Sequence, residues 1–100
     1  MSIPKSLKGV TRYILTFYRT ASSYDWKELE DALRKRGYEI VVNQQNDDEI
    51  IADVYLKNIN SLIPLVSLCE ANNWEVGYSN EPNKRLITTY IRGQISIIKV

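Results

Sequence analysis

Hydrophobic and polar residues alternate along three short stretches, Arg12–Tyr18, Tyr38–Asn43 and Ile50–Lys57. Alternation with a period of two, in segments rich in aromatic and β-branched residues, predicts three β-strands. The second and third strands are joined by the polar tip Gln44–Asp48 and form a hairpin around which the rest of the chain is organised. The uncharged set of each strand is expected to face the core: Tyr13, Leu15 and Phe17, then Tyr38, Ile40 and Val42, then Ile50, Ala52, Val54 and Leu56.

A helical pattern precedes the hairpin. Between Asp25 and Gly37, apolar residues recur every three or four positions, which predicts an amphipathic helix. Asp25 and Glu28 have the spacing of an N-terminal capping pair. The run Arg34-Lys35-Arg36 places cations in the last turn, and Gly37 supplies a left-handed stop.

A second helix is expected within Asn58–Asn73, with Asn60 or Ser61 as its cap and Pro64 in its first turn. A strand through Trp74, Val76 and Tyr78 follows. Two further strands, Leu86–Ile91 and Gln94–Val100, meet at Arg92-Gly93.

The order of elements is strand, helix, strand, strand, helix, strand, and then a hairpin. This order predicts an α+β protein with a ferredoxin-like βαββαβ two-layer sandwich and an added C-terminal β-hairpin, which either extends the sheet or covers its free face. Residues 1–10 are expected to be a flexible lead-in, and residues 11–100 a single domain.

The composition narrows the class of protein. The chain has 100 residues, and 13 basic against 12 acidic residues leave a net charge of +1. Such a balance provides no overall field that attracts nucleic acid or an acidic membrane. A single cysteine, Cys69, excludes an internal disulfide, and no apolar run has the length of a signal peptide or membrane span. We therefore expect a soluble, cytoplasmic protein.

The residues offer little for catalysis. The chain lacks histidine, which is the commonest general base and metal ligand. Cys69 lies on the apolar stripe of the second helix, where an inert thiol is expected. The carboxylates of Asp47-Asp48-Glu49 lie on a hairpin tip, where solvation is expected rather than convergence on one ion. We expect no enzymatic activity, no cofactor and no metal. An enzymatic alternative would need a metal site built from Asp25, Asp53 or Asp47-Asp48.

The opening strand Tyr13-Ile14-Leu15-Thr16-Phe17 and the order of elements resemble the small ferredoxin-fold nucleases of CRISPR adaptation. In that family the first strand ends on a metal-binding aspartate. The corresponding place here is Tyr18-Arg19, which contains no carboxylate. Nuclease activity is therefore not inferred from the resemblance.

The sheet face opposite the helices is expected to carry more apolar side chains than a solvent-exposed surface usually has. Exposed apolar patches of this kind usually mark an interface. We expect the protein to be a small regulator, adaptor or inhibitor, encoded by a phage or mobile element, that docks a protein partner or forms a homodimer through this face. The expected contact residues are Ile14, Tyr18, Val41, Ile51, Tyr55 and Lys57.

The alternative is a domain that binds single-stranded RNA or DNA through the same face. Tyrosines on a sheet can stack on unpaired bases, as in RNA-recognition motifs. The third strand, however, lacks the glycine and aromatic pair of that family's signature, and Asp53 would repel phosphate. The expected nucleic-acid contacts are Arg12 and Arg19 with the run Arg34, Lys35 and Arg36, whose other interpretation is helix-dipole complementation.

Overall fold

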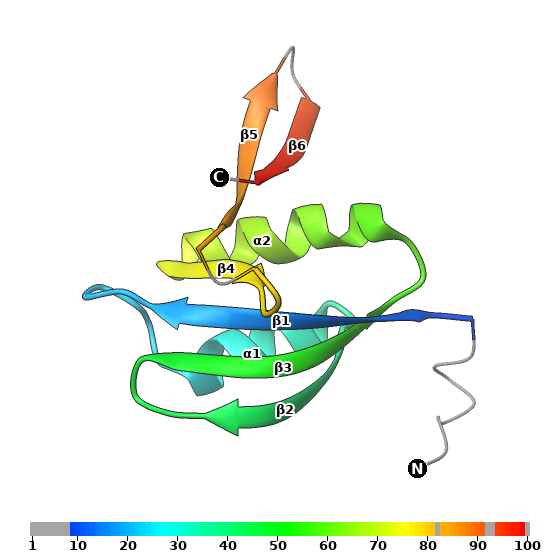
Figure 1. Ribbon diagram of the computed structural model, residues 1–100. Coiled ribbons are helices and arrows are strands. Elements are labelled where there is room, and N and C mark those ends of the chain that lie inside the picture. Colours follow the sequence, from blue (N-terminus) through cyan, green and yellow to red (C-terminus); the bar gives the residue numbers. More distant parts are fainter. Residues whose placement is uncertain (1–8, 82, 92–93, 100) are drawn as a thin grey trace.

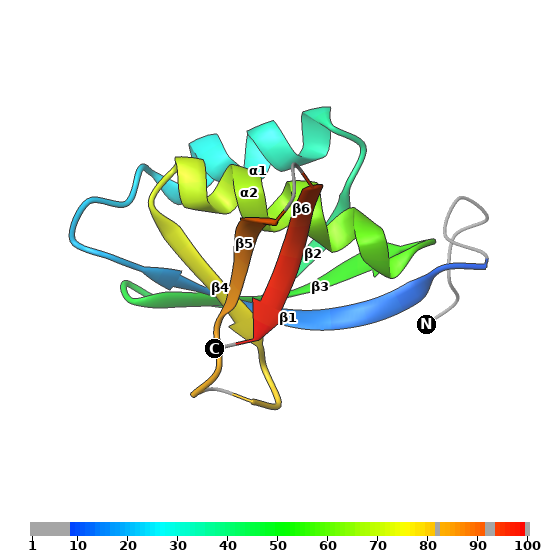
Figure 2. The same cartoon turned by 90° about the horizontal axis from the view of Figure 1, so that it is seen from above.

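The computed structural model describes residues 9–81, 83–91 and 94–99, and these form a mixed α+β protein with a six-stranded antiparallel sheet and two helices (Figure 1). The strand order is β2-β3-β1-β4-β5-β6. Both helices lie on one side of the sheet, as the view from above makes clear (Figure 2). The elements are β1 (Thr11–Arg19), α1 (Trp26–Lys35), β2 (Glu39–Gln45), β3 (Glu49–Leu56), the short 3₁₀ turn η2 (Ile59–Ser61), α2 (Leu62–Ala71), β4 (Trp74–Tyr78), β5 (Leu86–Ile91) and β6 (Gln94–Lys99).

β1 lies inside the sheet between β3 and β4, and pairs antiparallel with both. Its alternation decides which face each side chain takes: Leu15 and Phe17 are fully buried under the helices, whereas Ile14 is 40% exposed on the other face. The expected core face of this strand is thereby confirmed. β1 begins at Thr11, so the expected lead-in falls mainly on residues 1–8, which lie outside the described residues.

The central hairpin forms as expected, but its turn is shorter than the sequence indicated. Gln44 and Gln45 belong to β2, after a bulge between Val42 and Gln44 that changes the register with β3. The side-chain oxygen of Asn46 accepts hydrogen bonds from the backbone N–H groups of Asp48 and Glu49, both at 2.9 Å. This local asparagine turn closes the hairpin over fewer residues than a polar run suggests.

α1 begins and ends where the sequence predicts, but its expected capping bond is absent. Gly37 has φ = 92°, the left-handed conformation that stops the helix. Asp25 occupies the N-cap position, but its side chain makes no capping hydrogen bond. The expected capping pair with Glu28 is therefore wrong in its chemistry, since Glu28 donates its backbone N–H to the carbonyl of Asp25 instead, at 3.1 Å.

α2 is preceded by η2, and this turn changes the cap. The side chain of Asn58 accepts the N–H of Asn60 at 2.9 Å, so neither Asn60 nor Ser61 is the capping side chain. Pro64 lies in the first turn of α2, where its missing N–H costs nothing. After the helix, Asn73 takes φ = 63°, a left-handed position that asparagine tolerates.

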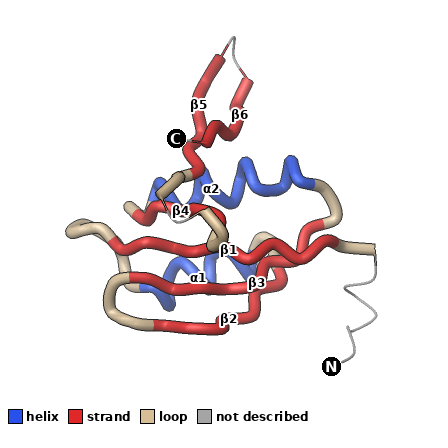
Figure 3. Tube along the Cα trace, in the orientation of Figure 1, coloured by secondary structure: helices blue, strands red, loops and turns tan. Residues whose placement is uncertain are grey.

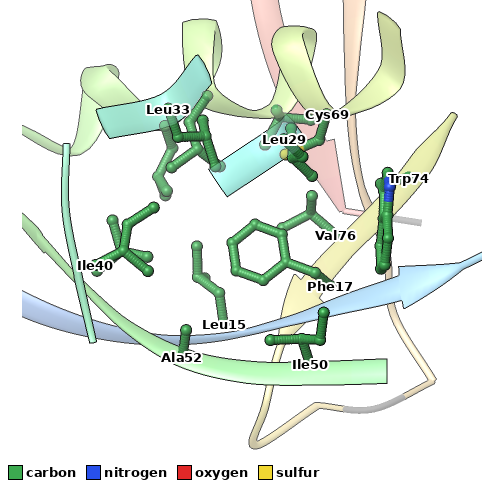
Figure 4. Packing of buried hydrophobic residues seen from close by; sticks show 14 of the residues in the cluster. Leu15, Phe17, Leu29, Leu33, Ile40, Ile50, Ala52, Cys69, Trp74 and Val76 are labelled. Carbon is green, nitrogen blue, oxygen red and sulfur yellow. The ribbon is translucent and has the colours of Figure 1, made fainter. Parts of the chain in front are cut away.

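The core fills the space between the helices and the sheet (Figure 4). Its three aromatic rings are in contact: the centre of the Trp26 ring lies 5.1 Å from the centre of the Phe17 ring and 5.6 Å from that of Trp74. The indole N–H of Trp74 donates to the backbone oxygen of Tyr24 at 2.8 Å, so the buried ring is not left with an unpaired donor. The buried hydrophobic residues are Leu15, Phe17, Trp26, Leu29, Leu33, Ile40, Ile50, Ala52, Val54, Leu56, Leu62, Leu65, Val66, Cys69, Trp74, Val76 and Leu86.

The C-terminal hairpin of β5 and β6 extends the sheet and does not cover its free face. Among the described residues, β5 pairs with β4 at Val76 and Leu86 and then turns toward α2 (Figure 3). The carboxylate of Glu70 on α2 accepts the backbone N–H of Thr88 at 2.7 Å and its hydroxyl at 2.6 Å. The helix layer thus holds the hairpin. None of the described helices is long and apolar enough to cross a bilayer.

Candidate functional site

The sheet surface opposite the helices, formed by β2, β3 and β1, is called the open face below. Strand register orders its side chains into cross-strand rows. One row joins Val41, Asp53 and Ile14, and the next joins Gln44, Ile51 and Thr16. A further row, at the β1 start, joins Glu39, Tyr55 and Arg12.

Asp53 is the polar centre of the open face and is only 8% exposed. The side-chain amide of Asn43 donates to its carboxylate at 2.9 Å, and the guanidinium of Arg12 lies 3.8 Å from its other oxygen. The Arg12 guanidinium offsets part of the negative charge of Asp53 at this surface. The expected repulsion between Asp53 and phosphate is weakened to that extent.

Apolar side chains flank this polar centre on both sides. Ile14 is 40% exposed and Val41 is 49% exposed, although both belong to strands whose other face is buried. Ile51 and Tyr55 are half-buried beside them. The structure thus brings together four of the expected contact residues, and Lys57 lies exposed just beyond β3.

The β4 side of the open face is covered by the connection between β4 and β5, which projects on the side away from the helices (Figure 2). The carbonyl oxygen of Lys84 lies over Gly77, so close that a Cβ at this glycine would be 2.6 Å from it. The hydroxyl groups of Thr16 and Ser79 are hydrogen-bonded at 2.9 Å, and Thr16 is only 3% exposed. This connection limits the accessible part of the open face to β2, β3 and the first half of β1.

Tyr18 lies under this connection. The guanidinium of Arg85 stacks 3.5 Å from the centre of the Tyr18 ring, and its Nε lies 3.5 Å from the carboxylate of Glu75. The ring face that Arg85 occupies cannot stack on a base. Sequence reasoning included Tyr18 and missed Arg85. Arg85 follows a cluster of turn residues, and nothing in that local sequence indicates that its side chain will contact β1.

The expected nucleic-acid contacts do not gather on one surface. Arg19 lies over the ring of Trp74 at 4.9 Å, on the helix side of the sheet. Arg34 donates to the carbonyl oxygen of Ile40 at 2.8 Å and to the carboxylate of Glu30 at 3.2 Å, so it joins α1 to β2. Lys35 is exposed on the same helix.

Three of the cations do lie near one tyrosine. Tyr55 pairs in register with Arg12, and an open groove of about 290 Å³ is lined by Tyr55, Lys57 and Arg36, among others. Glu39 lines the same groove and supplies an opposing charge. At this end of the sheet, an expected aromatic contact and expected cationic contacts lie together.

The other reactive groups are placed as ordinary structure. Cys69 is fully buried, and burial together with the neighbouring Glu70 raises the pKa of its thiol far above the usual range, so the thiolate nucleophile is suppressed. Asp47 and Asp48 are exposed on the hairpin turn. Within the described ranges, no three acidic or cysteine side chains converge as metal ligands.

Comparison with protein-family models, with curated proteins and with solved structures finds no match for this chain.

Proposed function

We propose that this protein is a non-catalytic interaction module that binds a protein partner, or a second copy of itself, through the open face. The observation that carries the proposal is the pair Ile14 and Val41, 40% and 49% exposed on either side of Asp53. Apolar groups around a satisfied polar centre are the composition of an interface core. A regulator, adaptor or inhibitor of phage or mobile-element origin, acting in the cytoplasm, is the role we propose for such a module.

The chemistry of the surface supports recognition by packing. Burying a Val or Ile side chain contributes about 1.5–3 kcal/mol relative to leaving it exposed. Asp53 is already hydrogen-bonded to Asn43, so a partner that covers it need not supply a hydrogen bond to replace the water that is lost. The contact set we propose is Ile14, Val41, Ile51, Tyr55 and Lys57; Tyr18 is excluded, since Arg85 stacks on it.

The test compares Val41→Asp with a matched control, Ile59→Asp. Ile59 is 54% exposed on η2, away from the open face, so both changes place a carboxylate on an exposed apolar position. Light scattering and native mass spectrometry over a wide concentration range measure self-association and retained partners. We expect Val41→Asp to weaken the complex about tenfold or more and Ile59→Asp to leave it unchanged. A wild-type monomer that retains no partner, or equal effects of both variants, would contradict the proposal.

A second candidate function, binding of single-stranded RNA or DNA, is favoured by the cations around Tyr55. Arg12 pairs with Tyr55 in register, and Arg36 and Lys57 line the groove beside it. A base stacked on a tyrosine ring contributes about 1–3 kcal/mol, and the cations would contact the phosphates of the strand.

Fluorescence anisotropy with labelled poly-pyrimidine oligonucleotides tests this candidate. Affinity should fall steeply with salt, and Tyr55→Ala should weaken binding at least tenfold. Tyr24→Ala is the matched control, because Tyr24 is 53% exposed and lies outside the open face. The absence of any anisotropy change at low salt would eliminate the candidate.

We also propose that the first four strands and the two helices form a ferredoxin-like βαββαβ unit, to which β5 and β6 are added. The strand order supports this assignment: α1 connects β1 to β2 across β3, and α2 connects β3 to β4 across β1. Two interleaved crossovers of this kind define the split βαβ arrangement. An experimental structure with another connection between the strands would contradict it.

A further inference from the structure

β1 is longer than β4, and this difference leaves part of its edge without a neighbour. β1 pairs with β3 from Thr11 onward, but its pairing with β4 begins only at Leu15. Figure 1 shows β1 continuing past the end of β4. Along Thr11–Ile14, the described residues therefore place a strand on one side of β1 only.

The backbone groups on that edge point outward at alternate residues. Ser79 donates its N–H to the carbonyl oxygen of Ile14 at 3.0 Å, which shows that Ile14 directs its backbone groups away from β3. Backbone direction has a period of two along a strand. Arg12 therefore presents its N–H and its C=O to the same side, just beyond the point where the chain of β4 turns away.

The outer edge of β2 is protected by comparison. Arg34 donates to the carbonyl oxygen of Ile40 at 2.8 Å, and the bulge between Val42 and Gln44 bends the strand. Bulges, covering groups and charged side chains are means by which proteins prevent unwanted pairing at a strand edge. The described part of the Arg12 edge has no bulge in its register with β3, and the charge of Arg12 selects against a partner strand that carries a cation opposite it.

An open groove of about 650 Å³ lies against the Arg12 edge. It is bounded by Arg12, Tyr13 and Ile14 on one side and by residues 78–81 on the other. Tyr13 and Tyr78 pack against the core and give the groove an aromatic wall on the helix side. On the other side, the side chain of Arg12 is 56% exposed and reaches Asp53 only at 3.8 Å.

We propose that this edge, here called the β1 slot (Arg12–Ile14 with residues 78–81), binds an extended segment of a partner protein as an added β-strand. The segment carries an acidic side chain opposite Arg12 and apolar side chains at the two flanking positions. This interaction is separate from the open-face docking proposed above and does not depend on it.

The chemistry of the segment follows from the register. Residues directly opposite each other in antiparallel strands put their side chains on the same face. The residue opposite Arg12 therefore lies beside its guanidinium, where a carboxylate is favoured. Its neighbours point to the helix side, toward Tyr13 and Tyr78. The N–H and C=O of Arg12 supply main-chain hydrogen bonds, as in other cases of recognition by strand addition.

A pair of variants at one position separates the backbone from the side chain. Arg12→Pro and Arg12→Ala both remove the guanidinium, but only proline also removes the N–H that faces the slot. Because that N–H does not point to β3, proline here breaks no bond of the β1–β3 ladder. The probe is a phage-displayed library of random linear dodecapeptides selected against the full-length wild-type chain, followed by affinity measurements on the selected peptides.

We expect selected peptides to share the apolar-acidic-apolar pattern and to bind Arg12→Pro about tenfold more weakly than Arg12→Ala, since the proline variant lacks a main-chain donor. Failure to select any peptide, or equal affinities for the two variants, would overturn the proposal. If Arg12→Pro does not fold, hydrogen exchange of the wild-type Arg12 amide decides the question. Slower exchange with peptide bound supports strand addition, and unchanged exchange refutes it.

Discussion

Gly77 provides the sharpest test of how the β4–β5 connection is packed on the open face. Its backbone is not in the left-handed region, so an alanine is allowed by φ. A Cβ at this position would lie 2.6 Å from the carbonyl oxygen of Lys84, whereas ordinary contact begins at 3.4 Å. The connection would have to move by the difference, 3.4 − 2.6 = 0.8 Å.

That movement is resisted on several sides. The N–H of Lys84 is hydrogen-bonded to the oxygen of Glu81 at 3.0 Å, and the next residue, Arg85, stacks on Tyr18. Leu86 then enters the core with 3% exposure. Forcing extra atoms into a packed site costs about 1–3 kcal/mol. Without the contact, alanine in a strand would instead stabilise by about 0.5–1 kcal/mol relative to glycine. The sign of the change in the free energy of unfolding therefore shows whether Lys84 packs over Gly77.

Urea denaturation measures this change, with the fluorescence of the buried Trp26 and Trp74 as the probe. We expect Gly77→Ala to lower the free energy of unfolding by about 1–3 kcal/mol. Gly37 is the control: a Cβ there meets nothing within 4 Å, but φ is +92°. Gly37→Asn should lose less stability than Gly37→Ala, because asparagine accepts a left-handed backbone. Gly77→Asn should be no more stable than Gly77→Ala, because the strain at that position comes from the Cβ contact. A Gly77→Ala protein as stable as wild type would refute the packing of Lys84 over the sheet.

Two further changes test other contacts. Burial raises the pKa of Tyr38 above its ordinary value of 10.0, against the opposing influence of Arg36. The folded state therefore holds the phenolic proton more tightly than the unfolded state does. The stability that the protonated tyrosine contributes is present below pH 10 and is lost as the pH rises through the raised pKa. Urea titrations from pH 8 to pH 11 should show a smaller alkaline loss of stability in Tyr38→Phe than in wild type, and parallel curves would contradict this. Glu70→Ala removes both hydrogen bonds to Thr88, so the Thr88 amide should exchange faster and the free energy of unfolding should fall by about 1 kcal/mol. Thr88→Val, which retains the N–H bond at 2.7 Å, should lose less than Glu70→Ala, and equal losses would show that the backbone bond contributes nothing.

The sequence predicted the elements well where local chemistry decides them. Alternation along β1 and β3 identified the buried side chains, and Gly37 identified the end of α1. Local chemistry was misread at helix caps and at the hairpin turn. Asp25 has the right spacing for a cap but makes no such bond, and Asn58 rather than Asn60 or Ser61 caps the turn before α2. Asn46 closes the hairpin within residues that the polar pattern assigned to a longer tip.

The candidate site depended more on tertiary structure. Four of the apolar contacts were accessible to sequence reasoning, because period-two alternation fixes which residues share a face. The cover over Tyr18 was not, since Arg85 is 67 positions away in sequence and reaches the ring only because β4 pairs with β1. The run Arg34-Lys35-Arg36 likewise looked like a charged surface, but Arg34 caps the β2 edge.

By itself, the amino-acid sequence determined the periodicity of the strands and helices, the face that strand side chains take outside the β2 bulge, and the absence of histidine. These properties follow from local geometry and composition. Only the tertiary structure decided that the hairpin of β5 and β6 docks on α2, that Arg12 and Asn43 lie against Asp53, and that β1 continues past β4. Each of these features depends on how the strands and helices pack together and on where each strand ends, which the residues adjacent in sequence do not decide.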